Sequence, residues 1–155
     1  MLPEQAIEIS KVRFDHAKEC LRDAKLLLAG ESYRSAANRA YYAIFHAMRA
    51  VLALDGVDMK HHSGIISEFR KRYIKTGVFD ISLSGLSSEL SDVREGSDYN
   101  DFFIVSKADT AEQVRVGRDV FDGGRNLSAD KNIESVRHLT QTVTQTGQKR
   151  DGRNR

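Results

Sequence analysis

Four polar side chains recur along one side of a predicted helix, and their types could bind an anion or move a proton. They are Arg39, Tyr42, His46 and Arg49. The spacing of i, i+3, i+7 and i+10 places them on one stripe of a helix. Arginine holds phosphate groups, and histidine exchanges protons near neutral pH, so the stripe could be a phosphate site or a general acid/base site. The competing interpretation, which spacing alone favours, is a polar seam that only fixes helix packing.

A second polar group, residues 94–101, spans the end of a later predicted helix. The predicted partners of Arg39 and His46 are the acids along that helix and at its end, with Asp98 the first choice. They are Glu89, Asp92, Glu95 and Asp98. Arg94 and Asp98 are four residues apart, so they could equally pair with each other. The candidate catalytic residues are therefore Arg94, Asp98 and His46. The candidate phosphate-binding residues are Arg39, Tyr42, His46, Arg49, Arg94 and Tyr99.

The sequence gives little support for metal chemistry or for a common catalytic motif. His61 and His62 are adjacent and cannot easily face one ion, and His16 with Cys20 supplies only two ligands. A phosphate loop, a dinucleotide fingerprint and a Gly-x-Ser-x-Gly elbow are all missing from the sequence. We therefore expect neither a metal nor a cofactor.

The elements that must position these residues are predicted to be helices. Residues 4–29 repeat apolar side chains three or four apart, which indicates one buried helix face, and Gly30 ends the pattern. Residues 32–54 are apolar on most sides, which is typical of a central helix. Asp55-Gly56 ends that helix. The predicted buried face of the first helix consists of Ala6, Ile9, Val12, Ala17, Leu21, Ala24 and Leu28.

Three further helices complete the predicted all-α bundle. One covers residues 64–75, with Ser63 as a possible N-cap, and another covers 84–97. The fifth begins at a capping-box pattern in which Asp109 follows Ser106 by three residues. It is predicted to end at Asp122-Gly123-Gly124. The fold class is thus an up-and-down bundle of about five helices.

Composition predicts one globular domain with a basic tail. Of 155 residues, 40% are hydrophobic and 30% charged, and no apolar run approaches the ~18 residues of a membrane span. The start does not read as a signal peptide, and the single cysteine excludes an internal disulfide, so we expect a cytoplasmic protein. Residues 1–122 hold 17 Lys/Arg and 19 Asp/Glu, whereas residues 123–155 hold 7 and 3. We predict a bundle at 1–124 and a disordered, dispensable tail at 125–155.

Three stretches together resemble the HEPN domain family, in a branch of small archaeal and bacterial proteins. They are Asn38–Ala47 (NRAYYAIFHA), Lys60–Ile66 (KHHSGII) and Val93–Phe103 (VREGSDYNDFF). Each stretch is weak alone, but their order and spacing are specific. The resemblance covers about residues 5–122 and does not include the tail.

The resemblance implies a helical bundle that commonly forms homodimers. Many members of the family are metal-independent endoribonucleases, often toxins neutralised by a nucleotidyltransferase encoded beside them. Their signature is an arginine, four to six residues, and a histidine in a cleft shared by two protomers. In this chain the matching region is Arg94–Tyr99, with Asp98 where the histidine is expected. Arg39 and His46 satisfy the count, but they lie on the second predicted helix.

The leading prediction is a HEPN-domain partner of a nucleotidyltransferase in a toxin–antitoxin-like pair. It would bind a nucleotide or RNA phosphate in the cleft of a homodimer, with no membrane contact. One alternative is a metal-independent endoribonuclease toxin that uses Arg39 and His46 or Arg94 and Asp98. The other is a non-catalytic helical interaction module.

Overall fold

The computed structural model describes residues 3–80 and 105–151, and this part of the chain contains only helices and their connections. The predicted all-α fold is confirmed. The predicted helix at 84–97, together with Arg94, Asp98 and Tyr99, lies outside the described residues. The elements in chain order are α1 (Pro3–Ala29), α2 (Tyr33–Leu54), α3 (His62–Phe69), the π-helix η1 (Arg70–Ile74) and α5 (Lys107–Asp151).

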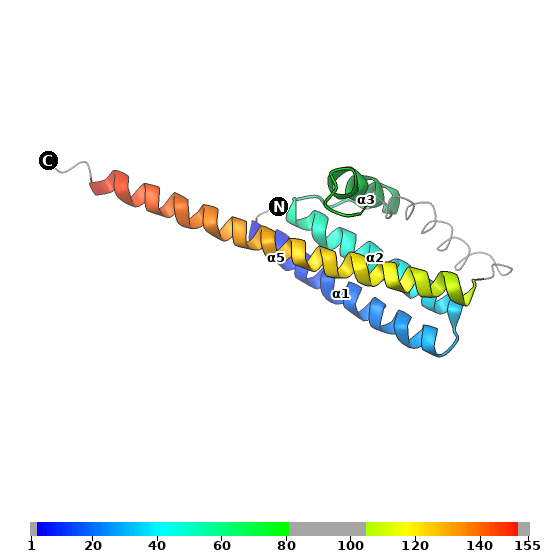
Figure 1. Ribbon diagram of the computed structural model, residues 1–155. Coiled ribbons are helices and arrows are strands. Elements are labelled where there is room, and N and C mark those ends of the chain that lie inside the picture. Colours follow the sequence, from blue (N-terminus) through cyan, green and yellow to red (C-terminus); the bar gives the residue numbers. More distant parts are fainter. Residues whose placement is uncertain (1–2, 81–104, 152–155) are drawn as a thin grey trace.

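Helix α2 is the centre of the bundle, as predicted. It packs against α1, α5 and α3, and 13 of its 22 residues are buried. Figure 1 shows α1, α2 and α5 running side by side, with α3 on another side of α2. Small side chains let these neighbours approach α2 closely. Its fully buried alanines are Ala36, Ala37, Ala40, Ala43, Ala47, Ala50 and Ala53.

The buried face of helix α1 is shifted by one residue from the predicted face over its second and third turns, where Ser10 and Arg13 are buried instead of Ile9 and Val12. Val12, which was expected in the core, is 46% exposed, whereas Arg13 is only 9% exposed. Arg13 is not on the predicted buried face because apolar periodicity ignores partners, and a charged group is buried only where it is paired. The buried position of Arg13 therefore depends on the contacts that its guanidinium makes.

Helix α3 begins earlier than predicted, and its last turn is wider. The residue before it is His61, so the proposed N-cap at Ser63 is wrong. The Lys75 N–H donates to the Arg70 carbonyl over 2.9 Å, the i→i+5 bond of a π-helix. Tyr73, in this π-turn, donates a hydrogen bond to the carboxylate of Asp55 at the end of α2.

Helix α5 begins as predicted but continues past its predicted end. The Asp109 N–H donates to the Ser106 Oγ over 3.0 Å, which confirms the cap. The helix then runs through Gly123 and Gly124 to Asp151, so the predicted end is wrong. A Cβ atom on Gly123 would lie 2.8 Å from the Phe79 ring. The glycine pair therefore marks close packing rather than a helix end.

The part of α5 after the glycine pair still contacts the bundle. Leu127 packs against the core, Ser128 is buried, and Lys131 forms an ion pair with Asp55. Figure 1 shows the rest of α5 projecting past the other helices toward the C-terminus. The predicted division between bundle and tail at residue 124 stays a prediction. From these contacts we propose that the bundle extends to about residue 132.

Candidate functional site

The antiparallel pairing of α1 with α2 brings two arginines and two histidines to one side of the bundle. Arg13 and His16 come from α1, and His46 and Arg49 come from α2. They share a hollow of about 260 Å³, which we call the α1–α2 groove. Its lining consists of Glu8, Ile9, Val12, Arg13, His16, His46 and Arg49.

Asp58, which lies just beyond the end of α2, accepts hydrogen bonds from both arginines. Its Oδ1 accepts from Arg13 Nη2 over 2.7 Å and from Arg49 Nη2 over 3.3 Å. The hydrogen bond from Arg13 is the main cause that lowers the pKa of the Asp58 carboxyl below its usual range. Arg13 Nη1 also donates to the Arg49 carbonyl over 3.2 Å. These contacts explain why Arg13 can be buried.

The two histidines of the groove lie against each other. Their ring centroids are 5.6 Å apart in an edge-to-face arrangement. Burial, followed by the neighbouring His16, Arg49 and Arg13, lowers the pKa of His46 to about 4. The unliganded His46 ring is therefore neutral at neutral pH. Two buried atoms of the groove, His46 Nδ1 and Arg49 Nε, have no hydrogen-bond partner among the described residues.

The other end of the predicted stripe is aromatic. The Arg39 guanidinium lies 5.1 Å from the centroid of the Tyr42 ring and donates to Asn38 Oδ1 over 2.7 Å. The Tyr42 ring centroid is in turn 6.2 Å from that of His46. Arg39, Tyr42, His46 and Arg49 thus form a continuous half-buried row along α2. Their proposed role in binding stays a prediction.

Neighbouring aromatic rings fix this row in place. Tyr41 Oη lies 2.7 Å from His62 Nδ1, and the His62 ring stacks on Phe45 with centroids 3.9 Å apart. Helix α3 therefore holds the aromatic side of α2 through its first residue. Ring stacking and a hydrogen bond together restrict how these side chains can turn.

Sequence reasoning missed three members of this site, which are Arg13, His16 and Asp58. Arg13 was left off the predicted buried face, His16 was considered only as half of an incomplete metal pair, and Asp58 had no role. The available signal was an acid just after the Asp55-Gly56 turn, which carries the chain back toward the end of α2. In the described part of the chain, no three His, Cys, Asp or Glu side chains converge to hold a metal ion.

Comparison with known proteins gives a consistent result. A model of the HEPN domain matches residues 10–126. A UPF0332 protein of Thermotoga maritima is 32% identical over 114 residues, covering 74% of this chain and 86% of that protein. A Methanocaldococcus jannaschii protein, named as a candidate toxin, is 27% identical over 126 residues, covering 81% and 85%. A UPF0332 protein of Archaeoglobus fulgidus is 33% identical, covering 79% and 96%.

None of the described helices combines the length and the apolar character that crossing a bilayer needs.

Proposed function

Because the chain belongs to the HEPN domain family, we propose that it binds a phosphate group of RNA or of a nucleotide in the α1–α2 groove. We further propose that it is the toxin-like member of a pair whose other member is a nucleotidyltransferase. The single observation that carries the binding proposal is the pair of unpartnered buried atoms, His46 Nδ1 and Arg49 Nε, at one groove. Buried polar atoms normally have a partner, and a phosphate oxygen could accept from Arg49 Nε and from the Nδ1–H tautomer of His46 once both side chains turn toward the groove.

The charges around the groove support an anion as that partner. Arg49 shares Asp58 with Arg13, and its own contact, at 3.3 Å, is the longer of the two. Asp58 keeps the shorter contact with Arg13, and its side chain is 45% exposed to solvent. The Arg49 guanidinium can therefore turn toward a phosphate without leaving the Asp58 carboxylate unpaired. Guanidinium groups bind phosphate through two parallel hydrogen bonds. Binding would depend on this local arrangement, since the folded part of the chain is not basic overall.

The aromatic end of the row supports a nucleotide or RNA rather than free phosphate. The Tyr42 ring is half-buried, and the Arg39 guanidinium lies over it. Aromatic rings and guanidinium planes stack on unpaired bases. A base on Tyr42 would place the adjoining phosphate toward His46 and Arg49, one to two turns along α2. Arg94 and Tyr99 remain proposed contributors from outside the described residues.

A metal-independent endoribonuclease is the second candidate, and the contact between His16 and His46 favours it. Cleavage through the 2′-hydroxyl needs one group to remove a proton and another to supply one. Two adjacent imidazoles could divide these roles. The low pKa of His46 makes it a weak base in the empty groove, but a bound phosphate would raise that pKa by opposing charge. Asp98 and Arg94 stay the alternative catalytic pair.

The proposed pairing with a nucleotidyltransferase rests on the family and on a relative named as a candidate toxin. We propose in addition that the protein forms a homodimer with a shared cleft. Helix α2 does not supply that interface, because α1, α3 and α5 already cover its apolar surface. A nucleotidyltransferase gene next to the gene for this chain would support the pairing.

Fluorescence anisotropy with a labelled single-stranded RNA tests the binding site. We expect Arg49→Gln to weaken binding about tenfold or more, because it removes a charge-assisted contact. The matched control is Arg115→Gln, an exposed arginine of α5 whose ion-pair partners among the described residues are Glu112 and Asp119 of its own helix. Wild-type affinity in a folded Arg49→Gln protein would contradict the proposal. RNA cleavage by the wild type that is lost in His46→Ala would support the ribonuclease function. If the wild type binds no RNA, the remaining hypothesis is the non-catalytic helical interaction module.

A further inference from the structure

A second hollow lies between the first half of α1 and the part of α5 that follows the glycine pair, and it shares no residue with the α1–α2 groove. We call it the α1–α5 pocket. Its volume is about 400 Å³. Small-molecule sites in proteins commonly enclose about 300–1,000 Å³, so the pocket has the size of a ligand site. Its polar lining consists of Ser10, Lys11, Asp15, Arg125, Ser128 and Asn132.

Two helix faces turn toward each other across this pocket. On each helix the lining residues are three or four apart, which places them on one face. Gly124 lets α5 approach α1 just before the pocket, because a Cβ atom there would lie 3.2 Å from the Phe14 ring. Facing helix stripes normally bury apolar side chains. Here both faces bury a hydroxyl group instead, since Ser10 is 3% exposed and Ser128 is 9% exposed.

The hydroxyl group of Ser128 is the main evidence for a ligand. Its Oγ atom is buried and has no hydrogen-bond partner among the described residues. A serine inside a helix can donate to the carbonyl group one turn earlier, but Ser128 does not. Buried polar atoms normally have a partner, and a hydroxyl group can both donate and accept. A molecule bound in the pocket would supply the missing partner.

The charged groups at the edge of the pocket favour an anion with a single charge. Lys11 and Arg125 are exposed cations, and Asp15 is the carboxylate of the lining. Neither Lys11 nor Asp15 forms a salt bridge in the part of the chain that the structure describes. Two cations and one carboxylate leave a balance of +1. This balance suits a carboxylate better than a doubly charged phosphate, which Asp15 would repel.

The pocket also offers apolar surface to a ligand. Ile7 of α1 and Leu54, the last residue of α2, are both half-buried and line it. Sites for small organic molecules typically combine apolar walls with a few polar groups that fix the orientation of the ligand. The lining therefore suits a molecule with one anionic end and an apolar body.

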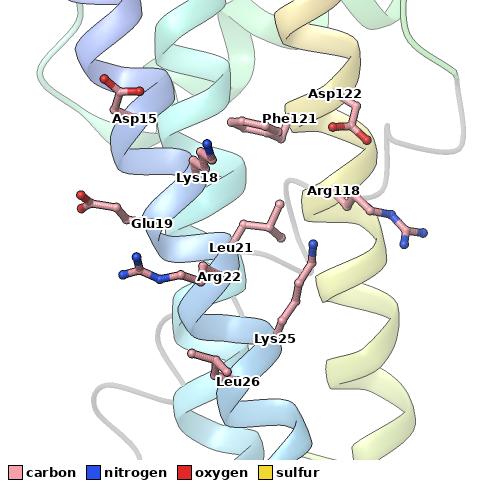
Figure 2. Close-up of a pocket in the computed structure, with 10 residues that line it drawn as sticks. All are labelled: Asp15, Lys18, Glu19, Leu21, Arg22, Lys25, Leu26, Arg118, Phe121 and Asp122. Atoms are coloured by element: carbon pink, nitrogen blue, oxygen red, sulfur yellow. The ribbon is translucent and has the colours of Figure 1, made fainter.

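A larger hollow lies further along the same two helices and lacks this evidence. Its volume is about 950 Å³, and it shares only Asp15 with the α1–α5 pocket (Figure 2). Its residues Leu21 and Phe121 belong to the packed core. Among the described residues, no buried polar atom without a partner lines it. The smaller pocket is therefore the better candidate for a ligand site.

We propose that the α1–α5 pocket binds a small organic carboxylate with a short apolar body. The carboxylate would accept hydrogen bonds from Ser128 Oγ and from the Arg125 guanidinium, with Lys11 adding positive charge at the edge. The apolar body would lie against Ile7 and Leu54. This site differs from the α1–α2 groove in its residues and in its ligand, so each can be tested without the other.

Amide NMR of the full chain, titrated with sodium hexanoate, tests this site. We expect the amide signals of residues 7–15 and 125–132 to shift together, with a Kd of about 1 mM or below. Acetate lacks the apolar body, and hexan-1-ol lacks the charge. Each of these two probes should therefore bind about tenfold more weakly than hexanoate, or weaker still.

Two substitutions separate a ligand site from an ordinary surface hollow. Ser128→Ala and Arg125→Gln should each weaken hexanoate binding about fivefold or more, because each removes a hydrogen-bond donor. Both proteins should fold, since the Ser128 hydroxyl has no partner to lose among the described residues and Arg125 is exposed. The matched control is Arg118→Gln, an exposed arginine of α5 outside the pocket, which should bind hexanoate as the wild type does.

Circular dichroism of each variant checks that the helices survive. RNA anisotropy of the same samples should be unchanged, because the α1–α2 groove keeps all its residues. A wild type whose amide signals do not move at about 10 mM hexanoate would overturn the proposal. So would equal affinities for hexanoate and hexan-1-ol, or a folded Ser128→Ala protein that binds hexanoate with wild-type affinity.

Discussion

At the scale of single residues, the partners of one ion pair differ sharply in burial. The Arg13 side chain is 10% exposed, whereas the Asp58 side chain is 45% exposed. Removing the exposed partner leaves a buried charge, but removing the buried partner leaves a carboxylate that water can reach. The cost of breaking a pair depends mainly on the group that stays behind.

We therefore expect opposite substitutions of this pair to have unequal effects. Asp58→Asn should lower the free energy of unfolding by about 2–3 kcal/mol, because Arg13 keeps its burial but loses its counter-charge. Arg13→Met should lower the free energy of unfolding by less than about 1 kcal/mol. Methionine can fill the space of the apolar part of the arginine side chain, and the exposed Asp58 carboxylate can be hydrated. Urea unfolding at neutral pH measures both values. An Arg13→Met protein less stable than Asp58→Asn would show that this account of the pair is wrong.

The polar row on α2 could be predicted from the sequence because its members share one helix and their spacing is fixed. Its partners could not, since Arg13, His16 and Asp58 come from other elements. Whether Arg13 or Val12 faces the core depends on a carboxylate 45 residues away, and no local pattern contains that information. The predicted partner Asp98 lies outside the described residues and stays a prediction.

At the scale of helices, the glycines of α5 serve close packing. The pair Gly123-Gly124 resembles a helix end in sequence, since glycine commonly follows the last turn. Here it lets α5 approach Phe79 on one side and Phe14 and Val51 on the other. Helix ends at Gly56 and Gly77, which have positive φ, were predictable because the chain turns there. The same residue type thus has two roles that only tertiary contacts separate.

This interpretation predicts opposite outcomes for two substitutions in one helix. Gly117→Ala should raise stability by up to about 1 kcal/mol, because alanine favours helix and the nearest atoms to the new Cβ are 3.6 Å away. Gly123→Ala should lower stability by about 1–2 kcal/mol, because the new Cβ meets a buried Phe79 ring. Phe79 is packed against Phe69 and Tyr73 and has little room to move. Thermal unfolding of both variants checks this, and a stabilised Gly123→Ala would contradict it.

Two truncations test where the folded part of α5 ends. Ending the chain after Asn132 should leave the melting temperature nearly unchanged, because the bundle contacts of Leu127 and Lys131 are kept. Ending it after Gly124 should lower the melting temperature by several degrees, since the core packing of Leu127 and the ion pair of Lys131 with Asp55 are lost. Equal melting temperatures would instead support the boundary at residue 124 that composition predicts. Differential scanning calorimetry measures both proteins.

At the scale of the whole molecule, the α1–α2 groove has a distinct chemistry. The α1–α2 groove collects cations and neutral imidazoles around unpartnered buried atoms, which suits an anion. The family could be inferred from three sequence stretches, but the groove could not, because it needs side chains of two helices whose relative rotation no local pattern gives.

The most direct test of the phosphate site is the pKa of His46, followed by NMR of its ring protons with and without a short RNA. In the free protein, burial and neighbouring cations hold this pKa near 4. A phosphate beside His46 Nδ1 should raise it by about one unit or more through its negative charge, and Arg49→Gln should remove that rise. An RNA that binds without changing the His46 pKa would contradict the account.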